Sequence, residues 1–126
     1  MPIRPQYHFR DSDNGLLAWD VSKLINKSAG LPTFQIKLED IRELDEPYWQ
    51  TQDSPLTPRA VANHAKLIHL CDLTFPIILC CEGRLMDGMH RVCKAWLQGL
   101  TLIDAVQFPE YLAPDYIGKT PEQLPY

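Results

Sequence analysis

The sequence predicts an α/β domain in which helices pack against a small mixed β-sheet. Two observations carry this prediction. Apolar runs rich in β-branched residues, typical of buried strands, alternate along the chain with segments whose apolar residues recur every three or four positions, as on one side of a helix. The chain has 126 residues, enough for one hydrophobic core, so we expect a single domain over 1–126.

Residues 1–30 are predicted to form an N-terminal extension with one turn and one short helix. The run "DSDNG" has the composition of a turn. Asp20 is well placed to cap a helix, because its side chain can accept a hydrogen bond from an amide of the first turn. The apolar side of that helix would consist of Val21, Leu24 and Ile25.

The stretch "TFQIKLEDI" alternates apolar and polar residues, which predicts a half-buried strand that begins near Phe34. An acidic segment, "EDIRELDEPYW", follows it. Thr57 has the position of a helix N-cap and Pro58 that of the first helical residue, so a helix is expected over 58–71. Its apolar positions recur at helical spacing and are expected to face the sheet: Val61, His64, Ala65, Ile68 and Cys71.

The second half of the chain repeats the alternation of strand and helix. "IILCC" after Pro76 is predicted to be a buried strand, "EGR" a turn, and "LM" a short paired strand. A helix is expected over 88–98, with Gly99 ending it. "LTLIDAVQF" is predicted to be the last strand. The apolar side of the 88–98 helix is expected to hold Met89, Val92, Cys93 and Trp96.

Residues 109–126 form a proline-rich tail with three tyrosines and no periodicity. We expect this tail to wrap the domain surface or to dock on a protein partner. Tyr111 and Tyr116 are its expected anchors.

The composition favours a cytoplasmic protein. The net charge is −4 and the basic residues are scattered, which argues against nucleic acid as a partner. No stretch has the length of a membrane span, and the N-terminus lacks the apolar core of a signal peptide. The four cysteines show no metal-ligand spacing, so we expect reduced thiols and no metal site.

The junction "DGMHR" at 87–91 contains residue types that favour binding of an anion. Gly88 allows close approach of the backbone, and the amides of Met89, His90 and Arg91 have no acceptor inside the predicted helix. The Arg91 guanidinium suits a phosphate, and His90 adds a donor. Asp87 would cap the helix, hold a magnesium ion or orient a hydroxyl. The alternative is that Arg91 is a structural ion-pair partner of Asp87 or of the acidic segment.

The spacing G-x-x-x-x-D-G-x-H-R, between a predicted strand and a helix, resembles the signature of the ParB/sulfiredoxin superfamily. The matching residues are Gly83, Asp87, Gly88, His90 and Arg91. The resemblance covers residues 34–108 and implies a ParB/sulfiredoxin-like fold. It also implies that nucleotide phosphates bind at the helix start, at Asp87, Gly88, Met89, His90 and Arg91.

Within this superfamily the nearest functional branch is that of the free-serine kinases. Sulfiredoxins have a cysteine where this chain has Met89, and a thioether cannot act as a thiolate nucleophile. The kinase resemblance implies ATP or ADP with Mg²⁺, a small hydroxyl-bearing substrate, and Asp45 or Glu46 as the catalytic base. Alternatively, these carboxylates belong to a solvated acidic loop.

Two other functions stay open at this point. One is a non-catalytic, nucleotide-gated interaction module whose tail contacts a protein. The other is a ParB-like nuclease. Three further side chains are ambiguous: His64 is expected to be a core or edge histidine, while Tyr48 and Trp49 would either stack on a nucleotide base or pack against the domain.

Overall fold

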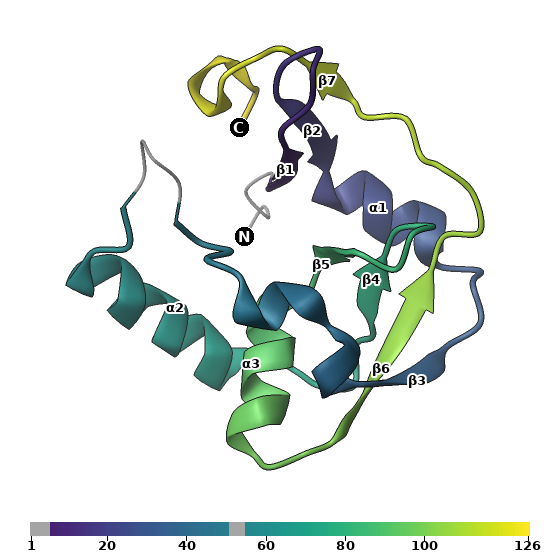
Figure 1. Ribbon diagram of the computed structural model, residues 1–126, viewed down its shortest axis with the longest axis vertical. Coiled ribbons are helices and arrows are strands. Elements are labelled where there is room, and N and C mark those ends of the chain that lie inside the picture. The colour runs from purple at the N-terminus through teal and green to yellow at the C-terminus, as the bar shows by residue number, and fades with distance from the viewer. Residues whose placement is uncertain (1–5, 51–54) are drawn as a thin grey trace.

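The computed structural model describes residues 6–50 and 55–126, which form two β-sheets and three α-helices, as the α/β prediction requires (Figure 1). The larger sheet is mixed and has the strand order β3-β6-β4-β5. In it, β4 runs parallel to β6 and antiparallel to β5, and β3 is antiparallel to β6. Its strands are β3 (Phe34–Lys37), β4 (Ile77–Leu79), β5 (Leu85–Asp87) and β6 (Leu102–Gln107).

A second, three-stranded antiparallel sheet joins the two ends of the chain. Its central strand, β2 (Leu17–Asp20), pairs with β1 (Tyr7–Arg10) on one side and with β7 (Tyr116–Ile117) on the other. This sheet was not predicted, because β1 and β2 are short and β7 has only two residues. The hairpin turn falls in the "DSDNG" segment, where Gly15 takes a left-handed conformation with φ 103°.

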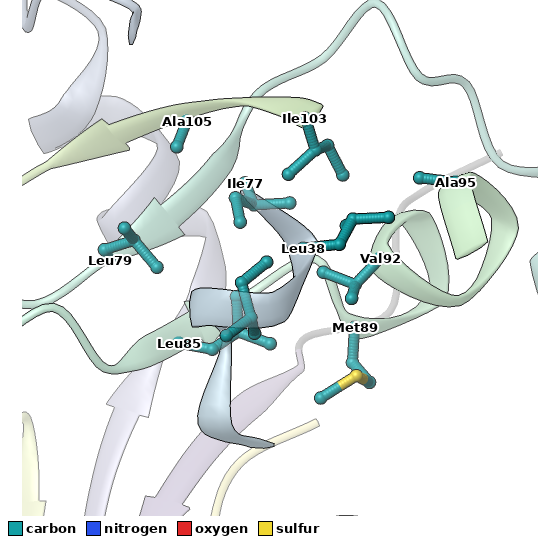
Figure 2. Close-up of a cluster of buried hydrophobic side chains, with 10 residues drawn as sticks. Leu38, Ile77, Leu79, Leu85, Met89, Val92, Ala95, Ile103 and Ala105 are labelled. Atoms are coloured by element: carbon teal, nitrogen blue, oxygen red, sulfur yellow. The ribbon is translucent and has the colours of Figure 1, made fainter. Parts of the chain in front are cut away.

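Hydrophobic cores cover both faces of the larger sheet. On one face, Ile77 and Leu79 of β4 pack with α3 (Met89–Leu97) and with the short 3-10 turns η1 (Leu38–Asp40) and η2 (Arg42–Asp45), as Figure 2 shows for most of this cluster. On the other face, Ile78 packs with Trp19 of β2 and Leu24 of α1 (Val21–Ser28). Burial on both faces explains the uninterrupted apolar run at β4.

The two predicted caps of the first two helices are confirmed. The Asp20 side chain accepts a hydrogen bond from the amide of Ser22 at the start of α1. The Thr57 hydroxyl accepts one from the amide of Ala60 at the start of α2 (Pro58–Leu70).

The predicted orientation of α2 is wrong. None of its residues is buried, and it lies beside α3 at the edge of the molecule rather than on the sheet (Figure 1). Val61, expected to face the sheet, is 49% exposed. The reason is that α3 already occupies that face of the sheet, so α2 forms an outer layer.

The set of α3 residues that face the core also differs from the predicted set. Met89 and Val92 are buried as expected, but Ala95 completes the stripe and Trp96 is 63% exposed. Small Ala95 allows α3 to approach the sheet closely, which the larger indole would prevent.

The tail wraps the domain. The carbonyl of Leu112 accepts a hydrogen bond from Trp19, a carboxylate oxygen of Asp115 accepts one from the amide of Asp20, and β7 extends the smaller sheet. Tyr116 is half-buried, as an anchor should be. Tyr111 is 67% exposed, and the contact with Trp19 is made by the neighbouring Leu112. A last 3-10 turn, η3 (Pro121–Gln123), precedes the buried Leu124.

None of the helices formed by the described residues combines the length and the apolar composition that a bilayer crossing requires. All four cysteines are free thiols.

Candidate functional site

A cleft of about 640 Å³ lies between the two sheets. Three segments far apart in the sequence line it: residues 6–11 around β1, residues 43–49 from η2 onward, and residues 84–90, which contain β5 and the start of α3. The cleft therefore includes most of the "DGMHR" junction that the sequence singles out.

The start of α3 opens into this cleft without a side-chain cap. Gly88 is the N-cap residue, in a left-handed conformation with φ 111°, and no described side chain accepts a hydrogen bond from the first turn. A Cβ atom on Gly88 would lie 2.7 Å from a methyl carbon of Ile77, so only glycine fits. The prediction that Asp87 caps the helix is wrong, because its carboxylate is bound elsewhere.

That carboxylate forms an ion pair with Arg91. Nη2 of Arg91 donates to Oδ2 of Asp87 at 2.7 Å, and Nη1 donates to the carbonyl of Pro76 at 2.9 Å. The two side chains are only 15% and 20% exposed. Arg91 is not among the residues that line the cleft, whereas Asp87, Gly88, Met89 and His90 are. The sequence allows two possible roles for Arg91, as a phosphate ligand or as an ion-pair partner of Asp87. The structure contains the ion pair.

Glu43 is a buried carboxylate at the wall of the cleft. It is 4% exposed, and its Oε2 accepts hydrogen bonds from the amide of Leu85 at 2.9 Å and from Nε of Arg84 at 3.5 Å. Its Oε1 is buried and has no hydrogen-bond partner among the described residues. A buried carboxylate oxygen normally has a hydrogen-bond donor, so a donor that reached Oε1 from the cleft would satisfy it.

The two carboxylates that the sequence nominates as bases lie differently. Asp45 is exposed at the end of η2 and does not line the cleft. Glu46 does line it, with Oε1 accepting from Nη2 of Arg84 at 3.2 Å. Both remain predictions, and Glu43 is the acidic residue of this segment that lines the cleft and keeps a buried oxygen without a described partner.

On the opposite wall, β1 contributes His8 and Arg10, which face the same way because they are two residues apart on a strand. Nε of Arg10 donates to Nε2 of His8 at 2.9 Å. Burial, together with the positive charges of Arg10 and Arg84, lowers the pKa of His8 to about 3. His8 is therefore neutral at physiological pH and serves as an acceptor.

An aromatic stack closes the cleft at the start of α3. The indole of Trp49 lies 4.0 Å from the ring of His64 at 15° and 4.9 Å from the ring of His90 at 21°. Nδ1 of His64 and Nε2 of His90 are 2.8 Å apart, within hydrogen-bond distance. Burial lowers the pKa of both histidines, and for His90 the neighbouring His64 lowers it further.

Tyr48, next to this stack, also lines the cleft. Burial raises the pKa of its hydroxyl to about 12, with the negative charges of Asp87 and Glu43 contributing. The hydroxyl is therefore protonated at any physiological pH and can donate a hydrogen bond.

Sequence reasoning missed three of these features. Glu43 is one of five acidic residues in a short segment, and nothing in the sequence tells which one turns inward. The pairing of His64 with His90 depends on where α2 lies, which was predicted wrongly. The His8 and Arg10 spacing in "YHFR" was a usable signal, since residues two apart share one side of a strand.

Comparisons with models of protein families, with curated proteins and with solved structures found no match to this chain. Within residues 6–50 and 55–126 no group of three or more histidine, cysteine, aspartate and glutamate side chains is arranged to hold a metal ion.

Proposed function

We propose that the cleft binds a nucleotide through its phosphates and transfers a phosphoryl group to a small substrate that carries a hydroxyl group. The observation that carries this proposal is the buried carboxylate of Glu43, which has one oxygen without a partner at the cleft wall. Leaving such an acceptor unsatisfied costs on the order of 1–3 kcal/mol. A ligand hydroxyl that donates to Oε1 would recover this free energy.

Other residues around the cleft supply donors suited to phosphate oxygens. The first amides of α3 are uncapped by any described side chain, and the positive end of the helix dipole favours an anion there. The guanidinium groups of Arg10 and Arg84 border the same space, and the protonated hydroxyl of Tyr48 adds a donor without charge. The resemblance of "DGMHR" to the ParB/sulfiredoxin superfamily supports the same assignment of this helix start to phosphate.

In this proposal Glu43 acts as the general base. Its Oε1 accepts the proton of the substrate hydroxyl while that oxygen attacks the terminal phosphorus of ATP. The bond from that phosphorus to the bridging oxygen breaks, and ADP leaves with the electron pair. A base of this kind contributes about 10²–10⁴-fold, and positioning and charge stabilisation supply the rest of the acceleration.

ATP would enter as its magnesium complex. The described residues offer no cluster that would hold the ion by itself, so the phosphates must provide part of its coordination.

Binding is tested by thermal unfolding in the presence of ATP, ADP, CTP and GTP, each with and without Mg²⁺. A nucleotide present at about a hundred times its dissociation constant should stabilise the fold by roughly 2.7 kcal/mol. If none of these nucleotides raises the melting temperature, the proposal fails.

Catalysis is tested with Glu43→Gln, which keeps an acceptor for the amide of Leu85 but removes the base. We expect ATP consumption, measured over a panel of amino acids and other small hydroxyl compounds, to fall by about 10²-fold or more. Nucleotide affinity should stay within a few-fold. Asp45→Asn is the matched control, since Asp45 lies on the same short segment outside the cleft and should keep full turnover.

The outcomes separate the candidate functions. Normal turnover by Glu43→Gln, with loss in Asp45→Asn or in Glu46→Gln, would restore the base that the sequence predicts. Nucleotide binding without turnover in the wild-type protein would point to the non-catalytic module instead.

A further inference from the structure

The paired imidazoles of His64 and His90 have no role in the function proposed above. They come from different helices, α2 and α3, and their facing nitrogens are 2.8 Å apart. Their ring centroids are 5.1 Å apart, and both rings stack on the indole of Trp49. Because the two imidazoles are so close to each other, they must lie against the same face of the indole.

A contact between two ring nitrogens at this distance requires one proton between them. In the neutral pair, either His64 donates from Nδ1 or His90 donates from Nε2. Adding one further proton gives a single arrangement: a hydrogen on Nε2 of His64, one in the bridge, and one on Nδ1 of His90. A second added proton would place two N–H groups face to face, which the 2.8 Å contact does not accommodate.

His90 connects the pair to the cleft. Its Nε2 is taken up by His64, so Nδ1 is the ring nitrogen left for a ligand, and His90 is one of the cleft-lining residues at the uncapped start of α3. The protonated pair always carries a hydrogen on this nitrogen, whereas the neutral pair carries one there only when His64 donates from Nδ1.

We propose that His64 is a positioning residue for His90 and that the pair takes up one proton when an anionic phosphate binds at the start of α3. This inference rests on the proposed function. The bound anion stabilises the charged pair, and the charged pair in turn holds the anion. The ligand class selected is one with a doubly ionised terminal phosphate.

The surrounding charges are compatible with one added positive charge. Asp87 on β5 favours the protonated form of His90, while Arg91 on α3 opposes it and is itself held by Asp87. The other titratable groups that line the same cleft are Tyr7, His8, Arg10, Asp11, Glu43, Glu46, Tyr48 and Arg84. Burial keeps the free pair neutral near pH 7, since it lowers the pKa of both rings.

The test is calorimetric titration of Mg²⁺-ATP, ADP and pyrophosphate in two buffers of different ionisation enthalpy. At about pH 7.5 the terminal phosphates of Mg²⁺-ATP and ADP are already ionised, so a proton taken up with these two ligands belongs to the protein. We expect uptake that approaches one proton, with affinity falling up to about tenfold per pH unit as the pH rises. His64→Phe keeps a ring against Trp49 but offers no acceptor, so its uptake should disappear.

Two variants complete the design. His64→Asn places an amide near the position of Nδ1 and should restore both the affinity and the uptake, which a merely structural role would not predict. His69→Phe, at an exposed position on the same helix, is the matched control and should behave as wild type. If His64→Phe does not fold, the wild-type protein and His64→Asn still decide the question.

Binding without proton uptake, or equal uptake in wild type and His64→Phe, would overturn this inference and leave the proposed function standing. Failure of all three ligands to bind would overturn the proposed function, and this inference with it.

Discussion

Among single residues, those of the "DGMHR" motif fall into two groups with different roles: some line the cleft, and Arg91 forms an ion pair. Gly88, Met89 and His90 line the cleft, whereas Arg91 turns back to Asp87 and to the carbonyl of Pro76. Arginine near a helix start opposes the dipole by roughly 0.3–1 kcal/mol. The nearby carboxylate offsets that cost, and Arg91 ties α3 to Pro76, just before β4, and to Asp87, the last residue of β5.

Arg91→Ala should therefore lower the free energy of unfolding by about 1–3 kcal/mol, because Asp87 would be left largely buried without its partner. Denaturant unfolding measures the loss. Adding Asp87→Asn should remove part of it, since the two side chains form one pair. A variant that keeps its stability but loses nucleotide affinity would instead place the guanidinium on the ligand, as the motif alone predicts.

At the scale of elements, α2 is the least secured helix. It buries none of its side chains, and it is held by the contact of His64 with α3 and by Lys94. Nζ of Lys94 donates to the carbonyls of His69 and Cys71 at 3.0 and 2.6 Å, at the C-terminal end of α2. A cation at that end of a helix satisfies carbonyls that lack an intrahelical donor.

Lys94→Met keeps the aliphatic stem and removes this cap. We expect faster amide hydrogen exchange in the last turn of α2 and a loss of about 1.5–3 kcal/mol in stability, the range for hydrogen bonds to a charged group. Lys66→Met, at an exposed position on α2, should change neither. Unchanged exchange in Lys94→Met would mean that other contacts hold the helix end.

Features that depend on neighbours along the chain were predicted from the sequence, whereas features that depend on contacts between distant segments were not. The caps at Asp20 and Thr57, the buried strand β4 and the turn before β5 depend on neighbours along the chain, and they were predicted correctly. The smaller sheet, the layer in which α2 lies and the inward turn of Glu43 depend on contacts between distant segments. The local motif therefore identified residues 87–90, which line the cleft, but it did not identify most of the other side chains around the cleft.

At the scale of the whole molecule, the two sheets enclose a titratable group that never carries charge in the folded state near neutral pH. His8 on β1 is 8% exposed and accepts a hydrogen bond from Arg10. Its pKa is lowered by burial from 6.5 to about 3. Since the unfolded chain binds the proton more tightly, folding becomes less favourable as the pH falls from about 6.5 toward 3.

His8→Gln should flatten this acid sensitivity. Glutamine keeps an acceptor near Nε2 for Arg10 but does not titrate. The wild-type free energy of unfolding should fall by up to about 1.4 kcal/mol per pH unit more than that of the variant between pH 6 and pH 4. Denaturant unfolding over this range provides the measurement, and His69→Gln, at an exposed site, should follow the wild type.

The way in which the cleft is walled has a consequence for the order of folding. One wall comes from residues 6–11 and the facing one from residues 84–90, and the sheet that holds the first wall is completed only when β7 pairs with β2. Contacts between segments so distant must overcome the entropy of closing a long loop before they contribute stability. In the order of folding, the cleft is therefore complete only when residues 6–11 have docked against residues 84–90. A ligand held between β1 and α3 closes the same loop, and its binding free energy adds directly to the stability of the sheet that joins the chain ends.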